Sequence, residues 1–150
     1  MDVMEWKRDG FTISTDKARL DRAVIHEFLR TSYWARGIPR RLVDRSIENS
    51  LCFGLYEEER QIGFARVISD LSTFGYLSDV FVVESRRGRG LATWFMQTIL
   101  AHPDLKGIRR WMLATADAHG LYRKVGFTEL SKPERIMEKL LSDPYGAGRG

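Results

Sequence analysis

The chain has 150 residues, of which 43% are hydrophobic and 29% charged, as in an ordinary globular domain. We predict one domain over residues 1–142 and a flexible, glycine-rich tail over 143–150. No apolar stretch approaches the roughly 20 residues of a membrane helix, no signal peptide is evident, and the lone Cys52 has no cysteine partner. These features predict a cytoplasmic protein with no membrane partner and no metal.

The charge is mildly basic, with 24 basic and 20 acidic residues giving a formal net charge of +4. The arginines occur in clusters, which suits a polyanionic ligand. A nucleic-acid partner is not expected, because the excess of charge is small and no helix-turn-helix or zinc-finger pattern occurs.

In chain order, the first half predicts a strand, two helices and three further strands. Thr15 or Asp16 can cap the first helix, whose apolar residues recur at helical spacing. Pro39 suits the first turn of the second helix, and Asn49 is its expected end. The strands are expected over 11–14, 51–56, 61–69 and 76–83.

The second half of the chain follows the strand expected over 76–83. This strand ends in a continuous apolar run, as expected of a central strand buried on both faces. A helix over 91–99 follows, and Pro103 stops it. Strands are then expected over 111–115 and 127–130, around a short helix over 117–125, and periodicity leaves the type of an element at 135–141 open. This order predicts an α/β protein with a mixed, mostly antiparallel sheet flanked by helices.

The turn Arg86-Arg87-Gly88-Arg89-Gly90 joins the predicted central strand to the next helix. The first N–H groups of a helix have no internal acceptors, and the helix dipole favours an anion beside them. Glycine lets a ligand approach the backbone, and arginine adds charge-assisted hydrogen bonds to phosphate. The turn therefore predicts a phosphate or pyrophosphate ligand. It lacks the Lys-Ser/Thr of a P-loop and the third glycine of a dinucleotide fingerprint.

Two motifs resemble the signatures of the GCN5-related N-acetyltransferases (GNAT). The run Arg87-Gly88-Arg89-Gly90-Leu91-Ala92 resembles their Arg/Gln-x-x-Gly-x-Gly/Ala signature. The run Leu121-Tyr122-Arg123-Lys124-Val125-Gly126-Phe127 resembles their second signature, a tyrosine on a short helix before Gly-Phe. The resemblance implies the GNAT fold and transfer of an acetyl group from acetyl-CoA to a primary amine of a small molecule or peptide. It also implies that a homodimer would be common.

The resemblance assigns roles to individual residues. A backbone N–H near Val82 would stabilise the developing oxyanion, and Tyr122 would protonate the departing thiolate. Thr115 stands where many members have an asparagine, so the short helix is expected to start late, with Asp117 as its cap. The expected acetyl-CoA-binding residues are Phe81, Val82, Val83, Arg87, Gly88, Arg89, Gly90, Leu91 and Ala92.

The general base must be found elsewhere, because the family's usual position falls near Leu77. Asp79 lies two residues further, which predicts the same strand face, and it is our candidate base. A structural pairing with an arginine is the alternative role for Asp79. Asp70 and His119 are the other candidate bases.

The acceptor pocket is expected between the first two helices and the turn over 70–76. Tyr33 and Trp34 could wall an amine site, and Trp34 could bind a cation through its ring face, although both could instead cap the core. Asp70 is a further candidate for acceptor binding. Two alternative functions stay open: a non-catalytic module that binds CoA or another metabolite, and a nucleic-acid-binding protein.

Overall fold

The computed structural model describes residues 2–146, and its six strands form one sheet in the order β1-β2-β3-β4-β5-β6. Each neighbouring pair is antiparallel except β5 and β6, which are parallel. The predicted mixed, mostly antiparallel sheet is confirmed. The strands are β1 (Glu5–Arg8), β2 (Phe11–Ser14), β3 (Leu51–Glu57), β4 (Arg60–Ser69), β5 (Phe74–Val82) and β6 (Arg110–Met112).

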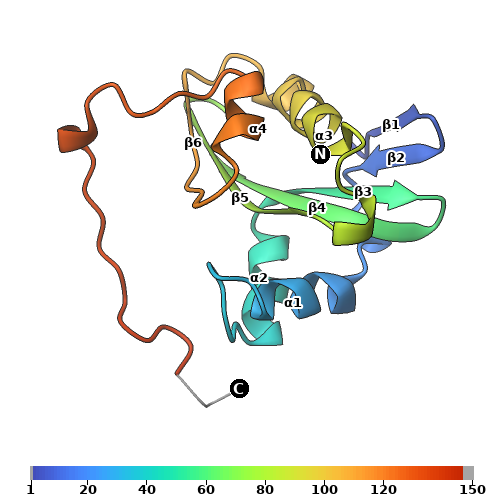
Figure 1. The fold of residues 1–150 in the computed structure, drawn as a ribbon, viewed down its shortest axis with the longest axis horizontal. Coiled ribbons are helices and arrows are strands. Elements are labelled where there is room, and N and C mark those ends of the chain that lie inside the picture. Colours follow the sequence, from blue (N-terminus) through green and yellow to red (C-terminus); the bar gives the residue numbers. More distant parts are fainter. Residues whose placement is uncertain (1, 147–150) are drawn as a thin grey trace.

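Four α-helices cover the two faces of the sheet (Figure 1). The helices α1 (Arg22–Arg30) and α2 (Arg40–Glu48) share a core with residues of β3, β4 and β5 on one face. The helices α3 (Leu91–Leu100) and α4 (His119–Lys124) contribute to the core on the other face. No helix within residues 2–146 is long and apolar enough to cross a membrane. Four short 3-10 helices complete the description: η1 (Lys17–Arg19), η2 (Glu84–Arg86), η3 (Pro103–Leu105) and η4 (Pro133–Arg135).

The two cores differ in the elements that they join. On the α1–α2 face, Phe81 of β5 stacks on Phe28 of α1 with ring centroids 3.9 Å apart. On the α3 face, Phe95 and Ile99 of α3 are fully buried in the cluster that contains Val82. Because β5 places residues in both cores, its carboxyl end is fixed from both sides of the sheet.

The amino-terminal half departs from the sequence prediction at two points. The strand β1 was not predicted, although it pairs with β2 through a tight turn in which Asp9 and Gly10 both have positive φ. The first long helix starts later than expected, because Asp21 caps α1 through the N–H of Val24. Asp16 instead caps the short helix η1, so the sequence Thr15–Asp16 marks a separate turn.

The carboxyl-terminal part also departs from the prediction. No strand forms over 127–130, and η4 at Pro133–Arg135 is the only regular element in residues 127–146. The element expected at 135–141 is irregular and exposed beyond that short helix. Only 143–146 of the predicted flexible tail are described, and 147–150 lie outside the described residues.

A bulge in β5 changes which side chains share a face. The register with β4 shifts between Phe64 and Arg66, and Asp79 on the opposite strand has a φ of 55°. Aspartate is among the few residues that adopt this left-handed conformation readily. The extra residue reverses the alternation of side chains, so Leu77 faces the α3 core whereas Phe81 faces the α1–α2 core. The expectation that Asp79 shares a face with Leu77 is therefore wrong, because Asp79 sits in the bulge and contacts residues on the α1–α2 side.

Candidate active site

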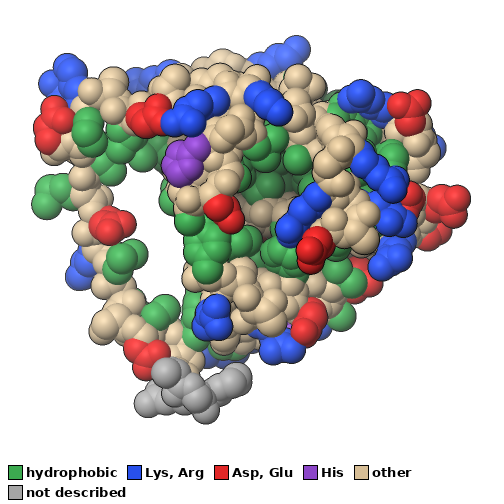
Figure 2. Space-filling model, viewed as in Figure 1, with side chains coloured by type: hydrophobic (Ala, Val, Ile, Leu, Met, Phe, Trp, Pro, Cys, Tyr) green, Lys and Arg blue, Asp and Glu red, His purple; other side chains and the backbone are tan. Residues whose placement is uncertain are grey.

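The sheet opens beyond the short parallel pairing of β5 with β6. The two strands pair only where Phe74–Tyr76 faces Arg110–Met112, and β5 then continues to Val82. Figure 2 shows a hollow over β5, between α4 and the turn that leads into α3, with a hydrophobic floor and basic side chains on its rim. This opening lies at the carboxyl end of β5.

The backbone of Val82 faces this opening. Val82 is opposite Gly63 of β4, while the next N–H, that of Val83, donates to Ile62 O at 2.8 Å. Because successive residues of a strand point their peptide groups to opposite sides, the peptide groups of Val82 point away from β4. The side chain of Arg87 confirms that orientation, since its Nε donates to Val82 O at 2.9 Å. The N–H of Val82 is thus directed toward the open side.

The predicted phosphate turn has two glycines in the left-handed conformation. Gly88 and Gly90 have φ of 80° and 75°, and a Cβ built on either would meet no atom within 4 Å. Gly90 is the N-cap of α3 and provides no side-chain cap, so the first N–H groups of the helix remain available to a ligand. Arg89 is exposed and has no ion-pair partner among residues 2–146, whereas Arg86 pairs with Glu57. Leu91 is buried and Ala92 is partly buried, so both anchor the helix.

Tyr122 of α4 is nearly buried, with 8% of its surface exposed. Burial raises the pKa of its phenol to about 12, and nearby Tyr33 and Asp117 add to the rise. Its hydroxyl makes no hydrogen bond to another described residue. Tyr122 lines a hollow of about 430 Å³ together with Met112–Thr115, which continue the path of β6, and with exposed His119. A protonated phenol is therefore held beside the β6 side of the opening.

Tyr33 and Trp34 follow α1 and reach the same region from the other side. The hydroxyl of Tyr33 accepts a hydrogen bond from the N–H of Ala116 at 2.9 Å, which ties the loop after α1 to the segment before α4. Trp34 packs edge-on against Tyr33, with ring centroids 5.1 Å apart. Both rings are substantially exposed, at 54% for Tyr33 and 41% for Trp34. The structure thus brings the predicted aromatic residues close to Tyr122.

Asp79 connects this aromatic pair to the sheet. Its Oδ1 accepts from Trp34 Nε1 and its Oδ2 accepts from Arg66 Nε, both at 2.9 Å. The Arg66 and Asp79 side chains are only 14% and 9% exposed. Arg66 also donates to the hydroxyls of Ser50 and Ser78. The bulge therefore places a paired carboxylate at the Nε1 edge of the Trp34 ring, and its bond to Arg66 is the structural pairing that the sequence left open.

No role for Arg66 in this site was predicted from the sequence. Arg66 stands within β4 (Arg60–Ser69), in which residues 61–65 and 67 are buried. An arginine inside such a strand needs a partner, because an unpaired charge is costly to bury. The sequence thus indicated that Arg66 needs a partner. It could not identify Asp79 as that partner without the register of β4 and β5.

The helix α4 also begins later than expected. It starts at His119 with Ala118 as its N-cap, and Asp117 makes no cap hydrogen bond. Thr115 takes over part of that function, since its hydroxyl accepts from the N–H of Ala118 at 3.0 Å. The Thr115 side chain thus shapes the turn that precedes Tyr122.

Asp70 lies in the β4–β5 turn, at the opposite end of β5 from Val82. Its Oδ1 accepts from the backbone N–H groups of Ser72, Thr73 and Phe74, and its Oδ2 accepts from the Thr73 hydroxyl. These hydrogen bonds, led by those from Thr73, hold the pKa of Asp70 well below its usual range. The structure does not bring Asp70 to Tyr122 and Asp79.

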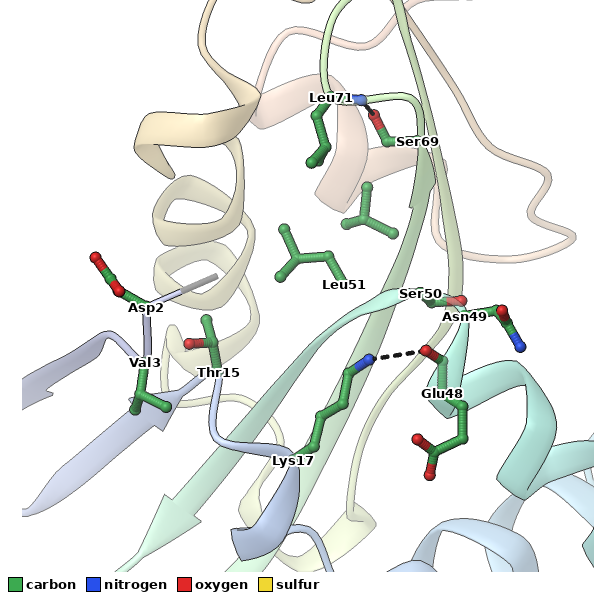
Figure 3. A pocket seen from close by; sticks show the side chains of 11 residues that line it. Asp2, Val3, Thr15, Lys17, Glu48, Asn49, Ser50, Leu51, Ser69 and Leu71 are labelled. Carbon is green, nitrogen blue, oxygen red and sulfur yellow. Dashed lines mark hydrogen bonds between the residues drawn. The ribbon is translucent and has the colours of Figure 1, made fainter.

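A second hollow, of about 550 Å³, adjoins this turn (Figure 3). Its lining comes from the amino-terminus, the ends of α2 and β4, and the start of β3. Figure 3 shows its polar contacts, a hydrogen bond from Lys17 Nζ to Glu48 O and another from the Leu71 N–H to the Ser69 hydroxyl. None of the lining residues belongs to the predicted catalytic or acetyl-CoA-binding sets. Within residues 2–146 no group of three or more His, Cys, Asp or Glu could hold a metal ion.

The comparisons with known proteins agree with this geometry. The family model of the acetyltransferase (GNAT) domain matches residues 48–129. A protein of Gibberella zeae, named as an acetyltransferase by inference, is 32% identical, and the match covers 79% of each chain. A crystal structure of a Xanthomonas campestris protein assigned to the GNAT family has 48% identity and a TM-score of 0.88, covering 93% of this chain and 99% of that one.

More distant structures share the fold. One is a predicted acetyltransferase of Clostridium acetobutylicum crystallised with acetyl-CoA, at 15% identity and a TM-score of 0.62, covering 93% of this chain and 96% of that one. Another is a GNAT-family acetyltransferase of Elizabethkingia anophelis with acetyl-CoA bound, at the same identity and TM-score, covering 81% of this chain and 78% of that one. The family match and the two more similar relatives, together with the sheet that opens beside a glycine turn, show that the chain belongs to the GNAT acetyltransferases.

Proposed function

We propose that this protein transfers an acetyl group from acetyl-CoA to a primary amine of a small molecule or peptide, in the opening between β5 and β6. One observation carries the proposal: the Val82 N–H faces the opening directly before the glycine turn that leads to the uncapped start of α3. The acetyl-CoA bound to the Clostridium and Elizabethkingia proteins supports the choice of donor.

The turn fits the pyrophosphate of acetyl-CoA. The free space over Gly88 and Gly90 would let phosphate oxygens reach the first N–H groups of α3. Arg89 has no ion-pair partner within residues 2–146 and would add charge-assisted hydrogen bonds. Arg87 has a different role, because its hydrogen bond to Val82 O fixes the turn against β5.

The chemistry is a direct transfer. The acceptor nitrogen forms a bond to the thioester carbonyl carbon while the carbon–sulfur bond breaks. The N–H of Val82 donates to the oxygen on which negative charge develops. The acceptor ammonium gives one proton to a base before the attack. Tyr122 then gives its phenolic proton to the departing thiolate, and the second proton that the nitrogen loses on becoming an amide restores the phenol. With its pKa raised to about 12, the phenol stays protonated throughout the physiological range.

We further propose that Asp79, beside the Nε1 edge of Trp34, attracts the acceptor ammonium and takes up its proton. Each carboxylate oxygen accepts one hydrogen bond from the protein, and a carboxylate offers about four lone-pair sites. The exposed ring of Trp34 could contact the same cation through its face. Asp79→Asn should shift or flatten the pH profile of kcat, and an unchanged profile would leave Asp79 with the structural role alone.

The substitution Tyr122→Phe tests the acid role. General acid catalysis typically contributes about 10²–10⁴-fold, and a thiolate is a good leaving group, so we expect a fall in kcat of roughly 100-fold. Affinity for acetyl-CoA, measured by isothermal titration, should change little. Tyr56→Phe is the matched control, because Tyr56 is also buried but lies in β3 and its hydroxyl lacks a hydrogen-bond partner within residues 2–146. An undiminished kcat in Tyr122→Phe would remove Tyr122 from the mechanism.

The non-catalytic alternative gives a different result with the unmodified protein. Saturable binding of acetyl-CoA without thiol release, over a panel of amines and peptides, would favour a CoA-binding module. Absence of binding by folded protein would contradict the proposed donor.

A further inference from the structure

The carboxylate of Asp117 makes no contribution to the short helix that follows it. Asp117 is exposed, its side chain caps no N–H group of α4, and it has no ion-pair partner among residues 2–146. The carboxylate is nevertheless close to Tyr122, because it adds to the rise in the pKa of the phenol that burial mainly causes. Figure 2 shows acidic as well as basic side chains on the rim of the hollow over β5. An unpaired carboxylate therefore lies beside the proposed site of acetyl transfer.

Two aromatic rings separate Asp117 from the candidate base Asp79. The Tyr33 hydroxyl accepts from the N–H of Ala116, the residue directly before Asp117, at 2.9 Å. The Nε1 of Trp34 donates to Asp79 Oδ1 at 2.9 Å, and the rings of Tyr33 and Trp34 have centroids 5.1 Å apart. The two rings are exposed and thus form a surface with one carboxylate beyond each end.

The two carboxylates differ in how their charges are compensated. The Asp79 carboxylate pairs with the guanidinium of Arg66, and both side chains are largely buried. That pair carries no net charge, whereas Asp117 keeps a full negative charge at the surface. Arg123 of α4 is paired with Glu129 and so does not compensate Asp117. A cation that enters this region is therefore attracted mainly by Asp117.

We propose that the acceptor is a diamine, with one nitrogen acetylated beside Asp79 and the second ammonium bound by Asp117. This inference rests on the proposed acetyl transfer, leaves its steps unchanged and adds the chemical class of the acceptor. The alkyl chain between the nitrogens would lie across Tyr33 and Trp34, because aromatic faces attract both apolar groups and cations. Acetylation converts one ammonium into a neutral amide, so the product keeps a single charge and should bind more weakly than the diamine.

The test compares three ligands of similar length that differ at one end. 1,4-Diaminobutane has two ammonium groups, butylamine has one, and 4-aminobutanoate has a carboxylate in place of the second. Each is titrated into isotopically labelled protein saturated with CoA, and binding is followed by the NMR signal of the Trp34 indole N–H. We expect 1,4-diaminobutane to bind about fivefold more tightly than butylamine, which is the upper end of what an exposed charge pair contributes. The 4-aminobutanoate should bind most weakly.

Three variants assign the preference to one side chain. Asp117→Asn should lower the affinity for 1,4-diaminobutane to that for butylamine. Asp117→Lys should reverse the preference, so that 4-aminobutanoate binds best. Asp104→Asn makes the same acid-to-amide change at an exposed position in η3 and should keep the preference for the diamine. Far-UV circular dichroism would show that the variants keep the fold, as expected for changes in exposed side chains.

Equal affinities for 1,4-diaminobutane and butylamine would overturn the inference, and so would a preference that survives Asp117→Asn. Tighter binding of 4-aminobutanoate by the unmodified protein would overturn it too, and would assign the second contact to a cation such as the exposed Arg36. Absence of binding by all three ligands would also contradict it. Because CoA carries no acetyl group, these titrations do not depend on acetyl transfer. A protein that acetylates butylamine and the diamine equally well would keep the proposed function and lose this inference.

Discussion

The pair Arg66–Asp79 allows a quantitative test of the bulge, through Asp79→Asn. Asparagine keeps the shape of aspartate and also tolerates the left-handed φ of 55°, so the substitution isolates the charge from the backbone. The guanidinium of Arg66, in a side chain that is 14% exposed, would then lie beside a neutral amide. The expected loss is therefore electrostatic.

The size of the loss follows from burial. Removing one partner of a buried ion pair costs about 3–5 kcal/mol, and a hydrogen bond to a charged group contributes about 1.5–3 kcal/mol. In the variant, Arg66 would still donate hydrogen bonds to the hydroxyls of Ser50 and Ser78. The loss of stability should therefore lie toward the lower ends of these ranges. We expect the free energy of unfolding to fall by about 2–3 kcal/mol, which for a chain of this length lowers Tm by roughly 5–10 °C.

Thermal unfolding followed by circular dichroism measures this effect. Glu27→Gln is the control, because it makes the same acid-to-amide change in an exposed pair with Arg30, where solvent screens the charges, and it should leave Tm nearly unchanged. Adding Arg66→Met to Asp79→Asn should recover stability, since no charge is then left buried and unpaired. A Tm for Asp79→Asn equal to that of the control would refute the reasoning.

Three further predictions concern other sites. Gly90→Ala should lower the free energy of unfolding by about 1–2 kcal/mol, because Gly90 has a φ of 75°. Gly120→Ala, within α4, should raise it by about 0.5–1 kcal/mol. Equal effects of the two substitutions in denaturant titrations would contradict this. Burial raises the pKa of the Cys52 thiol to about 11, so a thiol reagent at pH 8 should label it only after unfolding, and rapid labelling of native protein would count against its buried position. Burial lowers the pKa of His102, so the unfolded chain binds its proton first and stability should fall as pH drops through the unfolded value of about 6.5; His102→Gln should weaken that fall in acid unfolding curves, and an unaltered pH dependence would exclude His102 as its source.

The local parts of the site could be predicted from the sequence. The turn predicted to approach a ligand contains two glycines with positive φ, and Tyr122 lies on a short helix before Gly-Phe. Both features depend on residues adjacent in the chain. The hairpin of β1 and β2 was missed although Asp9-Gly10 is a strong hairpin signal, because the polar strand Glu5–Arg8 has little apolar alternation.

The remaining parts depend on contacts between distant segments. The link from Trp34 to Asp79 spans 45 residues, and that from Arg66 to Asp79 depends on a bulge that shifts the register. Alternation along a strand predicted the face of Asp79 wrongly, because one added residue reverses every side chain beyond it. The strand expected over 127–130 had an apolar pattern but no partner within the described chain.

The order of the strands bears on how this site assembles during folding. The strands β3, β4 and β5 follow one another through tight turns, so the centre of the sheet can form from local contacts between Leu51 and Val82. That unit carries Val82, Arg66 and Asp79, whereas Tyr122 joins through β6 and α4, across the parallel pairing of β5 with β6. Local unfolding of the segment after α3 would then abolish activity while the central sheet stayed folded. On heating, activity should therefore be lost before the circular dichroism signal of the strands.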